Sequence, residues 1–349
     1  MKNTLDSDIF SRWIDESRLI TTICHARPDG DAAGSSMAMV SFLKEVRGKD
    51  AAAVLPDPLP RTLGFLTEGC NVLCAAADAA AAEDRISRSD LLICLDFNTP
   101  SRTEGLESAL RGFKGRKVLV DHHEDPDTEA FDLCFSCTEV SSACELLYQL
   151  LLSMPDISGN ASLLPPACAE ALMAGMTTDT NNFANSVFPG TLKMASELLE
   201  AGVDRDKIID RIYHCERPNR LAAQGEMLSR LMQLEPEGFA VTVLPLSFYE
   251  RHELLDGETE GFVNLPLTLE GIRLSILARE DEGFFRVSLR SKKGLSARLL
   301  AKEFFHGGGH EQASGGKIFV PADVETPDKI ADYIKHITAR FLQEQSSAK

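Results

Sequence analysis

The sequence predicts an α/β fold in which a mostly parallel sheet is flanked by helices, followed by a smaller α/β domain. Continuous apolar runs at 91–95 and 117–120 are typical of strands that are covered on both faces. Segments with apolar residues at helical spacing separate such runs, as the crossover connections of a parallel sheet require. Functional groups are then expected outside the carboxyl ends of the strands.

The elements of the first domain, residues 1–190, follow from apolar spacing and turn residues. Pro28 and Gly30 end the strand that begins at Leu19, and Pro56 ends the next strand. The alanine-rich segment 75–82 fits either a helix or a loose connection. The other expected elements are a helix at 9–18, a strand at 19–24, a helix at 32–46, strands at 51–55, 91–95 and 117–120, and a helix at 169–176.

A helical connector and a second domain are expected to follow. Apolar residues recur at three- and four-residue steps from Leu192 to Leu234, which predicts a connector over 191–236. Pro236 stops this pattern, and the second domain is expected to cover 237–349. Its expected elements are strands at 239–244, 272–277, 284–290 and 317–320, helices at 296–305 and 327–344, and a glycine-rich loop at 306–316.

Length and charge limit the classes of function. The chain has 349 residues, enough for two cores, and a formal net charge of −17. This charge disfavours long duplex or single-stranded nucleic acid as a partner, because such binding needs many cationic contacts to phosphates. A short anionic substrate remains compatible, since bound divalent ions invert the local field.

Location signals and cysteines give a further expectation. No apolar run approaches the roughly 20 residues that a membrane span needs, and the first residues lack the apolar region of a signal peptide. We therefore expect a cytoplasmic protein without a membrane partner. The nine cysteines, an odd number, indicate small buried hydrophobic residues rather than a disulfide framework.

A cluster of imidazole and carboxylate groups follows the first predicted strand. His25, Asp29 and Asp31 lie within seven residues, and the turn at Pro28 and Gly30 allows them to face one point. Three such groups indicate half of a metal site. The alternative is that both aspartates are turn and helix-capping residues and that His25 is a satisfied polar residue. This motif alone leaves both interpretations open.

Further clusters of this kind strengthen the metal interpretation. Asp96 follows the run at 91–95, Asp121-His122-His123 follows the run at 117–120, and Asp179 follows a predicted helix. Mixed oxygen and nitrogen ligands suit Mn²⁺ or Mg²⁺ better than structural zinc. Two ions about 3.5–4 Å apart would need a bridging carboxylate and could share a hydroxide that attacks phosphorus.

The combined pattern resembles the DHH phosphoesterase family, named after the motif Asp121-His122-His123. The resemblance extends over nearly the whole chain and includes the associated C-terminal DHHA1 domain. The motifs that carry it are His25-x-x-x-Asp29-Gly-Asp31-Ala-Ala-Gly34-Ser35, Asp96, Thr178-Asp179-Thr180, Arg290-Ser291 and Gly307-Gly308-Gly309-His310-x-x-Ala313-Ser314-Gly315.

Within this family the chain is similar to the compact nanoRNase/pAp phosphatases. The resemblance implies 3′ to 5′ hydrolysis of RNA of about 2–5 nucleotides, removal of the 3′-phosphate of adenosine 3′,5′-bisphosphate (pAp), and dependence on two Mn²⁺ ions, with Mg²⁺ as an alternative. The implied ligands are His25, Asp29 and Asp96 for one ion, and Asp31, Asp96, His122 and Asp179 for the other, with Asp96 bridging.

The resemblance also implies roles for residues that do not bind metal. His123 would face the scissile phosphate as a general acid or charge stabiliser, and Asp121 would orient the histidines. In the DHHA1 domain, the implied substrate-binding residues are Arg290, Ser291, Gly308, Gly309 and His310. Three positions depart from the usual pattern: His306 and Asn181 stand where the family often carries glycine, and Ser314 stands in place of alanine.

Other functions remain open. A phosphodiesterase of the same superfamily that acts on cyclic di-AMP or pApA would share these catalytic motifs. A manganese-dependent inorganic pyrophosphatase is a more distant alternative, because the glycine-rich loop argues against it. A nucleotide-sensing module without activity is disfavoured, since every expected ligand is present. A homodimer is compatible with the sequence.

Overall fold

The computed structural model describes residues 4–255, 257–309 and 311–347. The chain forms two compact units, Met1–Cys215 and Glu216–Lys349. Each unit contains its own sheet and its own hydrophobic core. Within the described segments, no helix combines the length and apolar character that a membrane crossing requires.

The first unit is built on a parallel sheet with the strand order β3-β2-β1-β4-β5-β6. Its strands are β1 (Leu19–Ile23), β2 (Asp50–Leu55), β3 (Val72–Cys74), β4 (Leu91–Leu95), β5 (Arg116–Asp121) and β6 (Leu133–Ser136). Its α-helices are α1 (Thr4–Glu16), α2 (Gly30–Glu45), α3 (Ala79–Arg88), α4 (Glu107–Gly112), α5 (Ala143–Ser153), α6 (Pro166–Asp179), α7 (Pro189–Glu200) and α8 (Arg205–Tyr213).

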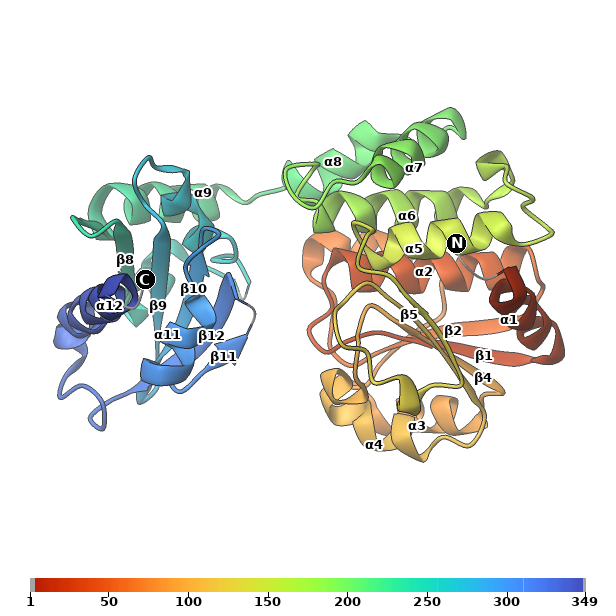
Figure 1. Ribbon diagram of the computed structural model, residues 1–349, viewed down its shortest axis with the longest axis horizontal. Coiled ribbons are helices and arrows are strands. Elements are labelled where there is room, and N and C mark those ends of the chain that lie inside the picture. The colour runs from red at the N-terminus through yellow and green to blue at the C-terminus, as the bar shows by residue number, and fades with distance from the viewer. Residues whose placement is uncertain (1–3, 256, 310, 348–349) are drawn as a thin grey trace. The chain divides into compact units, whose positions relative to one another are not determined.

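Helices cover both faces of this sheet. Helices α2, α5 and α6 lie on one face, and α3 and α4 lie on the other (Figure 1). The predicted parallel sheet flanked by helices is therefore confirmed. The chain runs outward from β1 to β3 and then returns to β4 beside β1, so the strand order reverses between β1 and β4. Open α/β sheets bind ligands at such a switch point, outside the carboxyl ends of the strands.

Helices α2 and α6 pack very closely because glycines line their contact. A Cβ added at Gly34 would lie 2.6 Å from the carbonyl oxygen of Ala171 and 3.0 Å from Cα of Gly175. A Cβ added at Gly30 would clash with the side chain of Thr178. These contacts place the first turn of α2 beside the last turn of α6, where Asp179 ends the helix.

The second unit is built on a mixed sheet with the order β11-β12-β10-β9-β8-β7, in which β8 and β9 are parallel and the other pairs are antiparallel. Its strands are β7 (Met232–Glu235), β8 (Phe239–Leu244), β9 (Leu274–Asp281), β10 (Phe284–Ser291), β11 (Gly308–Gly309) and β12 (Ala313–Phe319). Its α-helices are α9 (Pro218–Glu226), α10 (Leu246–His252), α11 (Ala297–Phe304) and α12 (Ile330–Ser347).

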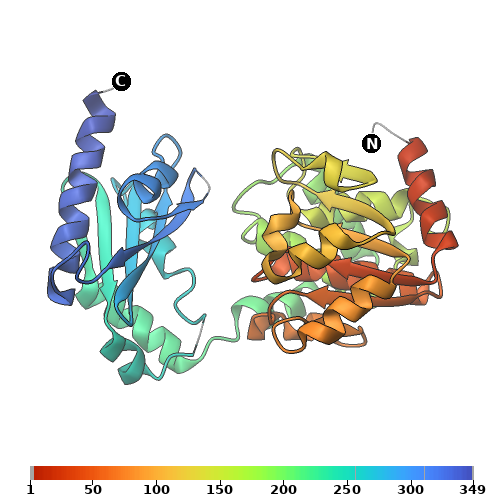
Figure 2. The same cartoon turned by 90° about the horizontal axis from the view of Figure 1, so that it is seen from below.

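The two faces of the second sheet have different covers. Helices α11 and α12 pack on one face, around Phe285, Val287 and Leu289 of β10, and Figure 2 shows α12 running along the sheet. Helices α9 and α10 and the 3₁₀ helix η6 (Phe262–Thr268) pack on the other face, against Leu277. The cover on this second face is partial, because Lys317 and Arg286 remain exposed.

Several expected elements differ from the structure. Residues 143–153 form α5, which the sequence analysis did not predict, and residues 232–235 form β7 although they were expected to be helical. The apolar steps near Leu234 do not distinguish an edge strand from a helix, since pairing with β8 decides between them. Half of the expected loop at 306–316 is also paired, because β12 begins at Ala313.

The glycine contact between α2 and α6 gives the first testable prediction. Gly34→Ala is expected to lower the free energy of unfolding of the first unit by about 1–3 kcal/mol, because the added methyl group overpacks the contact with Ala171. Urea denaturation followed by fluorescence of Trp13, the single tryptophan of the chain, would measure this change. The matched control is Gly112→Ala in α4, where an added Cβ meets nothing within 4 Å. Equal stabilities of the two variants would contradict the packing argument.

Candidate metal centre

The histidines and aspartates of the first unit gather at the switch point of its sheet. His25 follows β1, Asp96 follows β4 directly, and β5 ends in Asp121 before His122 and His123. Strands β1 and β5 both pair with β4 in parallel, so the three carboxyl ends lie at one edge. The three predicted strand-end clusters therefore meet in space.

Two helices bring the remaining carboxylates to this edge. Asp29 caps the N-terminus of α2, where its Oδ1 accepts hydrogen bonds from the backbone N–H groups of Asp31 and Ala32 at 3.0 and 3.1 Å. Asp31 lies in the first turn of α2, and Asp179 is the last residue of α6. The close packing of the two helices thus places Asp31 and Asp179 beside one another.

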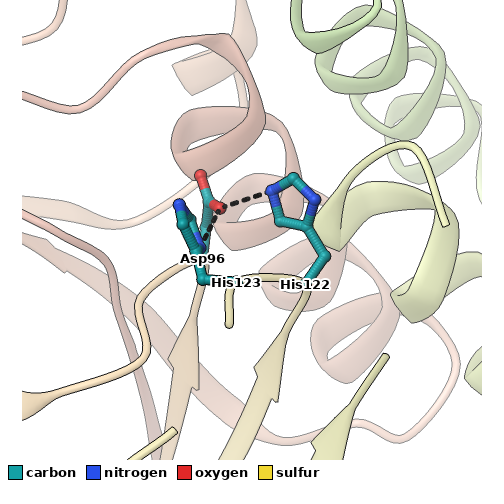
Figure 3. Close-up of side chains that lie close together, drawn as sticks. All are labelled: Asp96, His122 and His123. Carbon is teal, nitrogen blue, oxygen red and sulfur yellow. Dashed lines mark ion pairs between the residues drawn. The ribbon is translucent and has the colours of Figure 1, made fainter. Parts of the chain in front are cut away.

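Asp96 lies at the centre of the cluster. Its Oδ2 is 3.5 Å from Nε2 of His25. Its Oδ1 is 3.5 Å from Nε2 of His122 and 3.8 Å from Nδ1 of His123 (Figure 3). His25 Nε2 also lies 3.8 Å from Oδ1 of Asp29. The two oxygens of one carboxylate therefore face different histidines.

The other half of the cluster surrounds His122. Its Nε2 lies 3.6 Å from Oδ2 of Asp179 and 3.8 Å from Oδ2 of Asp31. The ligand atoms of Asp31, His122 and Asp179 lie within 4.8 Å of one another, and so do those of His25, Asp29 and Asp96. The second group contains the residues that the resemblance implied for one ion, and the first contains three of the four implied for the other, without Asp96.

The donor atoms of this cluster fit a cation. The side chain of Asp96 is 3% exposed, and its Oδ1 is buried without a hydrogen-bond donor. A buried carboxylate oxygen without a partner is unfavourable, and a metal ion would satisfy it. Carboxylate and imidazole groups with no thiolate among them suit a hard or borderline divalent ion.

The surrounding acids change the pKa values of His25 and His122 strongly. Burial alone would lower the pKa of His25, but hydrogen bonding and charge interaction with Asp29 and Asp96 outweigh this effect and raise it to about 10. Burial is likewise outweighed at His122, where Asp96 and Asp31 raise the pKa to about 10. Without a metal ion, protons on the imidazoles therefore compensate the acids.

The carboxylates have divergent affinities for protons. Burial opposes ionisation of Asp96, yet the nearby imidazoles of His122 and His25 hold its pKa well below the usual range. Burial and the negative charges of Asp96 and Asp179 raise the pKa of Asp31 well above its usual value. Burial is also the largest effect at Asp179, whose pKa rises to about 6. Such divergence is typical of functional sites.

The structure shows how Asp31 is held, which sequence reasoning missed. Its Oδ2 accepts a hydrogen bond from the N–H of Ala143 at 2.6 Å, and its Oδ1 accepts one from Cys144 at 2.9 Å. These amides form the N-terminus of α5, where a carboxylate is electrostatically favoured. A signal existed in the sequence, because Ser142 precedes Glu145 by three residues at the start of an apolar run.

Arg102 is a second residue that sequence reasoning missed. Its Nη1 lies 3.0 Å from Nε2 of His123, whose Nδ1 lies 2.7 Å from Oδ1 of Asp121. A guanidinium only donates hydrogen bonds, so Nε2 of His123 accepts and its Nδ1–H donates to Asp121. The backbone carbonyl of Arg102 also accepts a hydrogen bond from Ala26, which links the loops after β1 and β4.

The backbone at Asp96 is strained. Its φ is +63°, in the left-handed region that non-glycine residues rarely adopt. This conformation costs about 1–3 kcal/mol and persists where the surrounding structure enforces it. Here the N–H of Asp96 donates to the carbonyl of Val120 on β5, which fixes the turn. The turn aims the carboxylate at the histidines.

The implied substrate-binding residues lie in the second unit. Arg290 lies on β10, Ser291 ends that strand, and Gly308 and Gly309 form β11. The hydroxyl of Ser291 is buried and donates to the carbonyl of Leu295, while burial lowers the pKa of Arg290. His310 lies outside the described residues.

Comparisons with known proteins agree with this architecture. Residues 19–176 match the DHH family N-terminal domain, and residues 238–341 match the DHHA1 domain. The bifunctional oligoribonuclease and PAP phosphatase NrnA of Thermus thermophilus is 29% identical over 297 residues, 84% of this chain and 82% of that protein. The cyclic-di-AMP phosphodiesterase PdeA of Listeria monocytogenes is 25% identical over 316 residues, 87% of this chain and 45% of that protein.

A solved structure extends the comparison to the whole chain. The crystal structure of an exopolyphosphatase-related protein from Bacteroides fragilis is 29% identical, covers 99% of this chain and 98% of that chain, and has a TM-score of 0.90. Together these findings identify a hydrolytic enzyme of the phosphoesterase class. More particularly, the chain contains a DHH family N-terminal domain and a DHHA1 domain.

The protonated histidines give the second testable prediction. Metal ligands must be deprotonated, so Mn²⁺ binding to the metal-free protein at about pH 7.5 is expected to release about two protons, one from His25 and one from His122. Affinity should accordingly rise with pH up to the pKa of about 10 that both imidazoles have in the metal-free protein. Calorimetric titration in buffers of different ionisation enthalpy would measure the release.

A matched pair of histidine variants completes this experiment. His25→Gln should remove about one of the released protons, whereas His336→Gln on α12 should leave the release unchanged. A binding enthalpy that does not depend on the buffer would contradict the assignment of the cluster as a metal site.

Proposed function

We propose that this protein is a manganese-dependent phosphoesterase that degrades very short RNA from the 3′ end and removes the 3′-phosphate of pAp. The observation that carries the proposal is the Asp96 carboxylate, whose two oxygens face His25 and His122 separately. One carboxylate between two ligand groups is the arrangement that a two-metal phosphoesterase needs. The similarity to an oligoribonuclease and PAP phosphatase supports the choice of substrates.

The proposed ligands are the two groups described above. His25, Asp29 and Asp96 would hold one Mn²⁺ ion, and Asp31, Asp96, His122 and Asp179 would hold the other. When bound, the ions would polarise the phosphate and lower the pKa of a water molecule. The chain itself holds these ligands rigidly, since α5 fixes Asp31 and β5 fixes the turn at Asp96.

His123 and Arg102 are proposed to act on the substrate phosphate. Arg102 supplies a cation in a predominantly acidic site, and its planar donors suit phosphate oxygens. If phosphate takes over that interaction, Nε2 of His123 becomes free to carry a proton to the leaving oxygen, while Asp121 fixes the ring through Nδ1–H. Asp121 is thus a positioning residue in this proposal.

The second unit is proposed to contribute substrate-binding residues. Gly308 and Gly309 leave their backbone exposed, and Gly309 has a φ of +138° that excludes a side chain. Arg290 is half-buried at the paired strand β10, where a phosphate would complete its hydrogen bonding. Ser291 would support this surface through its bond to Leu295.

A second candidate is hydrolysis of cyclic di-AMP or pApA. The similarity to PdeA supports it, because the aligned region covers 87% of this chain. Inorganic pyrophosphate is a more distant candidate, because the glycine-rich loop of the second unit argues against it. Measured hydrolysis rates therefore have to distinguish these candidate substrates.

A substrate panel tests the proposed function. The protein with Mn²⁺ is expected to hydrolyse pAp and a ribodinucleotide faster than a 24-mer RNA, cyclic di-AMP or pyrophosphate. Asp96→Ala is expected to reduce kcat/KM more than about a thousandfold on every substrate, because the shared ligand of both ions is lost. The control is Asp84→Ala, an exposed carboxylate on α3. Turnover of pyrophosphate alone would refute the nuclease assignment.

The role of Asp121 can be tested separately. Asp121→Asn is expected to lower kcat about a hundredfold with little change in KM, because an amide can donate to Nδ1 of His123 and impose the wrong tautomer. Steady-state kinetics on pAp would measure both constants. Asp125→Asn, in the same loop but exposed, should retain full kcat. A kcat within threefold of wild type would exclude the positioning role.

A further inference from the structure

One face of the second sheet carries an exposed cluster of aromatic and cationic side chains. Phe285, Val287 and Leu289 of β10 point into the core, so the alternate residues of this strand point to the opposite face. On that face Phe284 lies opposite Phe319 of β12, and Arg286 lies opposite Lys317. These four residues of the cluster lie on the paired strands β10 and β12 of the second unit.

The aromatic part of the cluster forms a partly open surface. The ring centroids of Phe284 and Phe319 are 6.2 Å apart, and those of Phe319 and His306 are 5.5 Å apart. Phe319 is 38% exposed, and the His306 side chain is 55% exposed. Exposed rings side by side offer π-faces on which a base can stack.

The cationic part crosses three strands in one row. Arg286 of β10 lies opposite Arg279 of β9 on one side and opposite Lys317 of β12 on the other. Arg279 is half-buried over the ring of Tyr249, so Arg286 and Lys317 are the exposed cations of this row. Like charges in opposite positions destabilise a sheet, and a bound anion would relieve this effect. Arg286 lies 3.6 Å from Asp281, and His306 pairs with Asp323, but Lys317 has no ion-pair partner among the described residues. Its ammonium lies 4.8 Å from the ring centroid of Phe284.

Arg290 lies on the same face of the sheet as this cluster. Ser288 lies opposite Gly315, and Arg290 lies opposite Ala313, so small side chains occupy β10 and β12 between the cluster and Arg290. Arg290 lies four positions after Arg286 along β10, which corresponds to about 13 Å. A mononucleotide bound at Arg290 would not reach the aromatic and cationic cluster. A chain of several nucleotides bound at Arg290 would reach it.

We propose that Phe284, His306, Lys317 and Phe319 form a stacking platform for a single-stranded oligoribonucleotide. The rings bind a base and Lys317 binds an adjacent phosphate, so the platform favours RNA of three or more nucleotides over pAp. A duplex is not the ligand, because its bases are already stacked inside the helix. This inference rests on the proposed function and adds a determinant of substrate length to it.

The test compares substrates of different length on matched variants. Phe319→Leu is expected to raise KM for penta-adenylate about tenfold and to leave KM for pAp within twofold, because only the longer substrate reaches the platform. Phe319→Tyr should restore the wild-type KM, since it keeps the ring. Leu299→Ala on α11, which alters an equally exposed apolar residue, should have no effect on either substrate.

Binding without turnover gives an independent measurement. The anisotropy of fluorescein-labelled penta-adenylate, measured without added metal, should show about tenfold weaker binding to Phe319→Leu. Lys317→Gln should lower the slope of log Kd against log salt by about 0.7, the value for one phosphate contact on a single strand. Lys302→Gln, at an exposed lysine of α11, should leave the slope unchanged.

The outcomes separate the platform from the proposed function. If wild type fails to hydrolyse penta-adenylate but binds it in a manner that depends on Phe319, the proposed nuclease activity fails and the platform stands. If Phe319→Leu binds and cleaves penta-adenylate as wild type does, the platform is overturned and the proposed function stands.

Discussion

The candidate site depends on one buried carboxylate, that of Asp96. It lies at the strand end where the sheet order reverses, and it reaches histidines from both neighbouring strands. The strained turn that aims it is held by a backbone hydrogen bond to β5. The sheet topology, the strain and the charge distribution of the first unit therefore converge on this residue.

The acids around Asp96 explain why the cluster suits a metal ion better than a proton network. Asp31 and Asp179 resist ionisation next to Asp96, while His25 and His122 retain protons well above neutral pH. This compensation is incomplete, since Oδ1 of Asp96 still lacks a donor. Divalent ions would neutralise the acids without requiring protonated imidazoles.

The sequence predicted the strand-end residues but not the residues that hold them. His25, Asp96 and His122 follow apolar runs, so a local pattern and the geometry of parallel strands were sufficient. The contacts of Asp31 with α5 and of Arg102 with His123 join residues 112 and 21 positions apart. Such contacts depend on tertiary packing, which apolar spacing does not encode. The edge strand β7 was missed for the same reason, because its pairing with β8 defines it.

Both interpretations of the first acidic motif are compatible with the structure. Asp29 does cap α2, and Asp31 does satisfy helix amides, yet both carboxylates belong to the cluster. Backbone conformation explains two departures from the family pattern, those at Asn181 and His306. Asn181 and His306 have φ values of +45° and +47°, the conformation for which glycine is suited. Asparagine tolerates this region, and His306 is held there by Asp323 while its ring contacts Phe319. The departure at His306 therefore adds a ring to the exposed face of the second sheet, where glycine would add none.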